Sequence, residues 1–264
     1  MHNFTYHRPN DLEAAVALLR EADDPKLLAG GMTLLPTMKQ RLAAPSDLVD
    51  LSGIAALKGI KVDANEVVIG AMTCHADVAA SPEVARAIPA LAVLAGGIGD
   101  PAVRHCGTIG GSVANADPAA DYPAGVLALD AVIETTGRRI AADDFFTGLF
   151  ETALEPGEII TAVRFRIPDR GRYLKFAHPA SGYAVVGVFV ARFGATVRVA
   201  VTGAGPSAFR VAEMEQALAR NFSPAAIASI KVPAGQLMGD IHCSAEYRAH
   251  VISVLAQRAV DGEG

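Results

Sequence analysis

The sequence lacks a cluster of basic residues and a long apolar run. Its 23 Lys and Arg residues are outnumbered by 28 Asp and Glu residues, which gives a formal net charge of −5. Proteins that bind the nucleic-acid backbone gather Lys and Arg on one face, so we expect no nucleic-acid partner. The longest apolar run, YAVVGVFVA at 183–191, is too short for a membrane helix, which needs ~20 residues, and we expect no membrane span.

Cysteine is also scarce. Only Cys74, Cys106 and Cys243 are present, with no Cys-x-x-Cys spacing. This pattern fits neither a disulfide framework nor a zinc site, so we expect three ordinary thiols and no metal ligands. The first fifteen residues, MHNFTYHRPNDLEAA, do not contain a basic stretch followed by the apolar stretch that directs secretion. We therefore expect a cytoplasmic protein.

The order of the predicted elements favours an α+β fold. Apolar residues at helical spacing predict helices over 12–21, 34–42, 82–95, 123–130, 209–220 and 244–260. Pro89 is expected to kink or split the third of these. Short apolar runs predict strands over 26–30, 47–51, 66–73, 131–135, 158–167, 173–177, 184–192 and 196–205. Because strands and helices do not alternate regularly, we do not expect a doubly wound parallel sheet.

The best candidate for a domain boundary is PDRGR at 168–172. It combines proline, glycine and charge between two apolar segments. After it, the last two long strands are joined by Phe193-Gly194-Ala195, which is short enough for an antiparallel hairpin. The C-terminal part is therefore expected to be a small antiparallel sheet backed by helices.

Two glycine pairs follow apolar segments in the N-terminal half, in LLAGGMTLLP at 27–36 and in CGTIGGSVANADPAAD at 106–121. Such loops expose successive backbone N–H groups and let a ligand approach the chain closely, so that together they could wrap a diphosphate. Neither matches G-x-G-x-x-G or G-x-x-x-x-G-K-[ST], the two common phosphate signatures. Taken alone, a glycine pair is most often a plain turn.

The second loop carries polar groups that a plain turn does not require. Thr108 and Ser112 offer hydroxyls, Asn115 an amide, and Asp117 and Asp121 carboxylates that could accept hydrogen bonds from a sugar or polyol. An acidic loop repels a bare phosphate unless N–H dipoles meet its charge. A nucleotide-like cofactor therefore fits the loop better than an inorganic anion, although the residues alone leave a plain turn open.

Five segments carry a resemblance to a known family. They are LAGGMTLLPTMKQRL, IGAMTCHADVA, IGDPAVRHCGTIGGSVANADPAADYPAGVLALDA, ALEPGEIITAVRFRIP and YLKFAHPASGYAVVGVFVA, in this order. The sequence resembles the FAD-binding medium subunit of the molybdenum hydroxylases, a group that contains the xanthine dehydrogenase-type enzymes and the aerobic carbon monoxide dehydrogenases. The resemblance runs from about Tyr6 to the C-terminal helices.

The resemblance implies a fold similar to the vanillyl-alcohol-oxidase flavoproteins. An FAD-binding domain over 1–168, with subdomains of about 1–55 and 56–168, would clasp FAD. A C-terminal flavoprotein domain over 172–264 would close over it.

The resemblance also assigns cofactor-binding residues. Main-chain donors would hold the FAD pyrophosphate, Asp121 would bind a cofactor hydroxyl, and Ile98 and Leu154 would pack near the rings. Lys175 would lie close to the flavin, and Tyr183 would neighbour the isoalloxazine face. No side chain is expected to act as a catalytic nucleophile or a metal ligand. The pyrophosphate residues would be Ala29, Gly30, Gly31, Met32, Thr33 and Leu34, with Thr108, Ile109, Gly110 and Gly111.

Other roles stay open for three of these residues. Asp121 could cap the helix that follows it, since Asp is a favoured N-cap. Tyr183 could be a core aromatic at the start of an apolar strand. Lys175 could be a solvated charge on a strand.

The sequence also departs from the family pattern. Met32 stands where a polar residue is common, Cys74 where threonine is usual, and Ser112 where asparagine usually follows the glycine pair. These changes put single side-chain contacts in doubt. His75 is expected to satisfy a local hydrogen bond and is given no catalytic role.

The resemblance implies an FAD-dependent oxidoreductase subunit that works in electron transfer. It would take electrons from the [2Fe–2S] clusters of a small iron–sulfur subunit and pass them to NAD⁺, quinone or oxygen. The molybdenum cofactor would sit on a large subunit, in a dimer of three-subunit units. A stand-alone flavin oxidoreductase and a non-catalytic scaffold that has lost FAD are the alternatives. Neither the substrate nor the final acceptor follows from the sequence.

Overall fold

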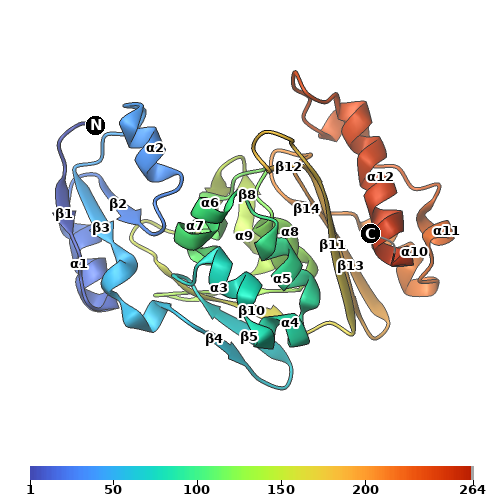
Figure 1. Cartoon of the computed structure of the whole chain (residues 1–264), viewed down its shortest axis with the longest axis horizontal. Helices are drawn as coiled ribbons and strands as arrows, with labels where there is room; N and C mark the ends of the chain where they lie inside the picture. The colour runs from blue at the N-terminus through green and yellow to red at the C-terminus, as the bar shows by residue number, and fades with distance from the viewer. Residues whose placement is uncertain (263–264) are drawn as a thin grey trace.

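The N-terminal part of the chain is a small parallel sheet with one flanking helix. The computed structural model describes residues 1–262, and Figure 1 shows this part at the left in blue. The strands pair in the order β1-β3-β2, and both pairings are parallel. Asp11 caps the helix by accepting a hydrogen bond from Ala14 N at 2.8 Å. The elements are β1 (Thr5–His7), α1 (Leu12–Glu21), β2 (Pro25–Leu28), α2 (Leu34–Lys39) and β3 (Asp47–Asp50), followed by the 3₁₀ turns η1 (Leu51–Gly53) and η2 (Ala55–Leu57).

The central part is a five-stranded antiparallel sheet covered by short helices. Its strands lie in the order β4-β5-β10-β6-β7, and β8 and β9 form a separate two-stranded sheet. The strands are β4 (Ile60–Val62), β5 (Glu66–Gly70), β6 (Val132–Thr135), β7 (Arg139–Ala141), β8 (Phe146–Gly148), β9 (Glu151–Thr152) and β10 (Ile160–Arg166). The helices are α3 (His75–Ala80), α4 (Pro82–Ala87), α5 (Pro89–Gly96), α6 (Pro101–Cys106), α7 (Ile109–Asn115), α8 (Tyr122–Ala128) and α9 (Ala142–Phe145).

The C-terminal part is a four-stranded antiparallel sheet in the order β11-β12-β13-β14. One face packs against α10 and α12, and the other faces α5 and α8, so that the sheet stands between two helical layers (Figure 1). Strand β12 is buried along nearly its whole length for this reason. The elements are β11 (Arg170–Ala177), β12 (Ala184–Phe193), β13 (Thr196–Thr202), β14 (Phe209–Arg210), α10 (Ala212–Arg220), α11 (Pro224–Ile227), η3 (Ala234–Gln236) and α12 (Ala245–Asp261).

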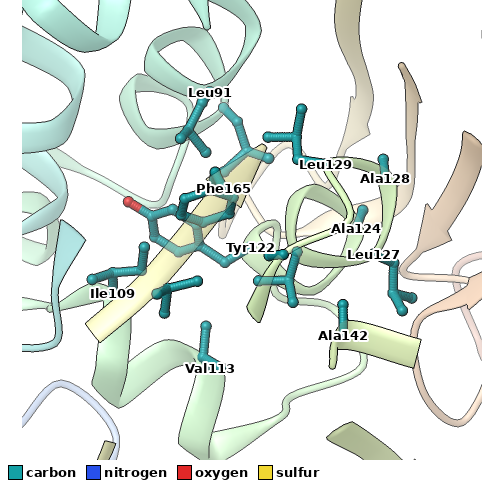
Figure 2. Close-up of a cluster of buried hydrophobic side chains, with 14 of the residues drawn as sticks. Leu91, Ile109, Val113, Tyr122, Ala124, Leu127, Ala128, Leu129, Ala142 and Phe165 are labelled. Atoms are coloured by element: carbon teal, nitrogen blue, oxygen red, sulfur yellow. The ribbon is translucent and has the colours of Figure 1, made fainter. Parts of the chain in front are cut away.

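The main core joins the central helices to both larger sheets. Tyr122 on α8, Phe165 on β10, Leu91 on α5 and Ile109 on α7 are among its buried side chains (Figure 2). Residues of β11 and β12, Phe189 among them, belong to the same cluster. A second cluster lies between the C-terminal sheet and α12, and a third, smaller one lies under α1.

The α+β prediction is confirmed, and the differences are local. Pro89 splits the predicted helix into α4 and α5. The predicted helix over 209–220 begins later, because Phe209–Arg210 pairs with β13. The segment 106–121, expected to be a loop, contains α7, and α6 precedes it. Asp100 followed by Pro101 is a start signal for α6 that the sequence reading missed.

Two further expectations concern domains and membranes. The division at 168–172 stays a prediction, and residues 263–264 of the predicted C-terminal domain lie outside the described part. Between residues 1 and 262, the structure contains no helix with the length and apolar character to cross a membrane.

Candidate functional site

A cavity of ≈ 590 Å³ lies between the N-terminal sheet and the central helices. Its walls come from segments that are far apart in the sequence. They are the turn after β2, the start of α2, the loop between α5 and α6, helix α7, the start of α8, the segment between β9 and β10, and the β11–β12 hairpin tip. Cavities of this size are typical sites for small molecules and cofactors.

The first glycine segment presents unengaged backbone donors at this cavity. Within residues 1–262, the main-chain N–H groups of Gly30 to Leu34 donate to no protein acceptor. Gly31 has φ +71°, a conformation that favours glycine, and it turns the chain from β2 into α2. The cavity wall includes every predicted residue of this segment, from Ala29 to Leu34. Thr33 precedes α2 but makes no side-chain capping bond.

The second glycine segment differs from the expectation. Ile109 N donates to Thr73 O at 3.1 Å, Gly110 N to Ala71 O at 2.8 Å, and Gly111 N to Thr108 Oγ1 at 3.1 Å. These three amides are therefore engaged within the protein, because Thr108 caps α7 and the β5–α3 connection supplies two carbonyls.

The glycines of this segment serve close packing. A Cβ atom on Gly110 would lie 2.6 Å from the Cβ of Ala71. Thr108, Gly110 and Gly111 line the cavity, whereas Ile109 is fully buried in the core and does not. The segment therefore presents to the cavity the Thr108 hydroxyl and the main chain of Gly110 and Gly111, which a ligand can approach closely because glycine carries no side chain to cover it.

The polar residues that follow the second glycine pair also reach the cavity. Ser112, Asn115, Asp117 and Asp121 all line it. The Asp117 carboxylate accepts a hydrogen bond from Ala119 N at 2.8 Å, which fixes its orientation.

Asp121 lies in a buried cluster with Tyr173 and Lys175. The Tyr173 hydroxyl donates to Asp121 Oδ1, and Lys175 Nζ lies 3.0 Å from the same oxygen. Burial raises the pKa of Asp121, while the Lys175 charge and the Tyr173 hydrogen bond act in the opposite direction. The capping alternative for Asp121 is wrong, because its side chain makes no capping bond to α8.

The remaining ring-contact candidates occupy different positions. Ile98, Leu154 and Tyr183 line the cavity, whereas Lys175 does not. The Lys175 side chain is 11% exposed, so the solvated-charge alternative is wrong. Tyr183 is 47% exposed, which excludes a core role. Partial burial raises the pKa of the Tyr183 hydroxyl, and Asp117 and Asp121 add to this.

The departures from the family pattern fall in different places. Met32 is 40% exposed at the cavity, and Ser112 also lines it. Cys74 does not line the cavity and instead pairs with Thr108 in an isolated antiparallel bridge.

Sequence reasoning missed several cavity residues. Leu27, Leu51, Met72 and Ile159, which belong to or pack against one apolar cluster, line the cavity, and so does Glu158. Hydrogen bonding from Arg138, Thr135 and the Glu155 amide lowers the pKa of Glu158 to about 2, despite partial burial. No local motif marks these positions, since they meet only in the folded chain.

His75 also lines the cavity, and it is 4% exposed. The expectation that it satisfies a local side-chain hydrogen bond is wrong for Nδ1, which has no partner within residues 1–262. Burial, together with the nearby Arg104 charge, lowers the pKa of the imidazole to about 4. His75 is therefore neutral at ordinary pH.

The sequence over residues 2–169 matches the family described as the FAD binding domain in molybdopterin dehydrogenase. The chain belongs to this family. It is thus a member of the FAD-binding subunits of the molybdenum hydroxylases, and its cofactor is FAD.

Relatives of this family align along almost the whole chain. It is 36% identical to the carbon monoxide dehydrogenase medium chain of Afipia carboxidovorans, over 98% of this chain and 96% of that one. It is 38% identical to the nicotine 6-hydroxylase medium subunit of Paenarthrobacter nicotinovorans, over 97% and 95%. A chain in a crystal structure of a Cu,Mo-CO dehydrogenase superposes with a TM-score of 0.87 and 35% identity, over 99% and 98%. The protein is accordingly an oxidoreductase subunit.

The cavity residues fit the cofactor of this family. FAD combines an anionic pyrophosphate with hydroxyls and two flat ring systems. Unengaged amides at Gly30 to Leu34 suit the anion, polar groups of Ser112 and Asn115 suit hydroxyls, and apolar walls such as Ile98 suit the rings. The assignment of individual residues to parts of FAD stays a prediction.

Proposed function

We propose that this chain is the electron-transfer subunit of a molybdenum hydroxylase complex. It takes electrons from the [2Fe–2S] clusters of a small partner subunit and delivers them to NAD⁺, quinone or oxygen. The molybdenum cofactor belongs to a large partner subunit. The complex is a dimer of heterotrimers in the cytoplasm.

The observation that carries this proposal is the run of unengaged amides from Gly30 to Leu34 at one cavity wall, with the half-exposed Tyr183 at another. Backbone N–H groups bind an anion without a lysine, so this wall holds the pyrophosphate. FAD supplies the redox chemistry, because it accepts electrons singly or in pairs. The protein supplies placement and electrostatics.

The other cavity residues orient the cofactor. Ile98 and Leu154 keep water from the rings, and Tyr183 offers an aromatic face to the isoalloxazine. The Asp121 carboxylate has lone pairs that Tyr173 and Lys175 do not use. With one of these it accepts a hydrogen bond from a cofactor hydroxyl. No side chain of this chain forms a covalent bond with substrate.

The partner assignment is supported by the relatives. Two of them are named as a medium chain and a medium subunit, and this chain aligns with nearly their full length. A protein of this size that matches a subunit throughout carries the role of that subunit and not of the whole enzyme.

The test is to purify the chain alone and together with co-expressed partner subunits. Visible spectra, released flavin and metal content are recorded for each preparation. Flavin with molybdenum and iron in one complex, at the mass of two heterotrimers, is the expected result. Flavin with turnover in the isolated chain would favour the stand-alone oxidoreductase, and a colourless protein that takes up no flavin would favour the scaffold.

A further inference from the structure

Lys175 belongs to β11, and this strand packs against the central helix α5 (Figure 1). Its ammonium group has acceptors on three separate segments. Nζ donates to Gly97 O at 2.6 Å, to Gly182 O at 2.9 Å and to Asp121 Oδ2 at 3.2 Å, and it also lies 3.0 Å from Asp121 Oδ1 as an ion pair. An ammonium has three N–H donors, so these acceptors use all of them.

Two of the three acceptors are adjacent to cavity walls. Gly97 comes directly before Ile98, and Gly182 stands between Ser181 and Tyr183. Ile98, Ser181 and Tyr183 line the cavity, whereas Lys175 itself does not. The walls also touch one another, since a Cβ on Gly182 would lie 3.5 Å from Gly99 O. Gly182 has φ +72°, so the hairpin tip turns there over the α5–α6 loop.

We propose that Lys175 is a positioning residue that clamps the Gly97–Gly99 segment to the 178–183 hairpin, and thereby fixes two cavity walls without contacting FAD. This deepens the proposed function, because these walls carry Ile98 and Tyr183, the predicted ring contacts. The anchor of the clamp is Asp121, whose buried carboxylate holds the ammonium in place. A buried charge that loses its partner destabilises the protein, so the ammonium of Lys175 is held in one position.

The first experiment uses the full chain without flavin, and therefore does not depend on the proposed function. Amide hydrogen exchange is compared between wild type, Lys175→Met and Tyr173→Phe. Tyr173 donates to the same carboxylate, whereas the side-chain hydrogen bonds that Gly97 O and Gly182 O accept within residues 1–262 come from Lys175. Lys175→Met is expected to speed exchange about tenfold or more in 97–99 and 178–183, with Tyr173→Phe unchanged there. Equal protection of these segments in Lys175→Met and wild type would overturn the clamp.

The second experiment titrates FAD into the same proteins and records the flavin absorption and circular dichroism. Lys175→Met is expected to bind FAD about tenfold more weakly, with an altered flavin spectrum. In a double-mutant cycle with Tyr183→Leu, the two effects are expected to be less than additive, because both act through the hairpin. Full additivity would mean that Lys175 and Tyr183 act independently, which would overturn the clamp. Wild type that binds no FAD would refute the proposed function and leave the exchange result intact.

Lys175→Arg covers the case in which Lys175→Met does not fold. The guanidinium keeps its charge beside Asp121 but is planar, so it cannot place donors on all three oxygens. Faster exchange in 97–99 and 178–183, with stability near wild type, supports the clamp. Unchanged exchange there argues against it.

Discussion

Gly30 lies directly against the main chain of Cys106. A Cβ atom on Gly30 would fall 2.1 Å from Cys106 O and 2.7 Å from Gly107 Cα. No side chain fits between these two backbones. The contact holds the first glycine segment, which carries the unengaged amides, against the segment that leads into α7.

Gly30→Ala is expected to separate these segments. The methyl group cannot be accommodated, since its neighbours are backbone atoms, and overpacking costs about 1–3 kcal/mol. FAD affinity is expected to fall about tenfold or more, because the Gly30–Leu34 amides are displaced relative to Thr108 on the opposite segment. Flavin titration and urea unfolding measure the two effects. Gly235→Ala is the control, since nothing lies within 4 Å of a Cβ there; a Gly30 variant that matches this control would contradict the prediction.

Gly111→Asp is expected to abolish FAD retention while the protein stays folded. A Cβ at Gly111 lies 3.0 Å from Thr108 Oγ1 and 3.3 Å from the Cβ of Ala29, at the cavity wall. The added carboxylate brings negative charge to the place where an anion is expected. Flavin content after purification is the measurement, with Gly96→Asp as the matched control, because Gly96 is exposed and has only Ala79 nearby. Full flavin occupancy in Gly111→Asp would show that the pyrophosphate lies elsewhere.

Tyr183 is expected to quench flavin fluorescence through ring contact. Tyr183→Leu should raise the fluorescence of bound FAD and weaken its binding severalfold, because an aromatic contact contributes about 0.5–1.5 kcal/mol beyond burial. Tyr183→Phe keeps the ring and should behave as wild type in both measurements. If both variants change the fluorescence equally, the hydroxyl, and not the ring, would be the important group.

His75 is expected to make the protein less stable in mild acid. Its pKa is about 4 in the folded protein and about 6.5 when unfolded, so the unfolded state binds the proton more readily. The contribution of neutral His75 is complete above pH 6.5 and is lost as the pH falls towards 4, at a cost of about 3 kcal/mol. Urea unfolding of wild type and His75→Gln between pH 4 and 7 isolates this contribution. Parallel stability curves for the two proteins would exclude it.

Much of the fold could be predicted, because prolines, glycines and apolar periodicity in the sequence mark where helices and strands begin and end. The proline at position 89 splits a helix as expected, and Phe193-Gly194-Ala195 joins two antiparallel strands. The short strands β1, β4 and β7 escaped prediction, because three residues carry too little periodicity. Strand β14 was read as helix, since its pairing with β13 is a tertiary contact that no local pattern shows.

The sequence predicted which residues meet at the cavity better than it predicted their hydrogen bonds. Motif resemblance identified both glycine segments, and all but Ile109 and Lys175 of the predicted residues line the cavity. The state of the second segment could not be foreseen. Its amides bond to Ala71 and Thr73, which lie more than thirty residues earlier in the chain. A glycine pair that packs closely and one that binds an anion have the same sequence pattern.

The cavity lies between the small N-terminal sheet and the rest of the protein, so one ligand touches both. The N-terminal sheet rests on a third, minor core, and so small a unit gains little stability from its own burial. A ligand that bridges the two parts stabilises their association by mass action. Loss of FAD is thus expected to leave residues 1–55 sensitive to proteases, so that cleavage near the N-terminus would report the cofactor content of a preparation.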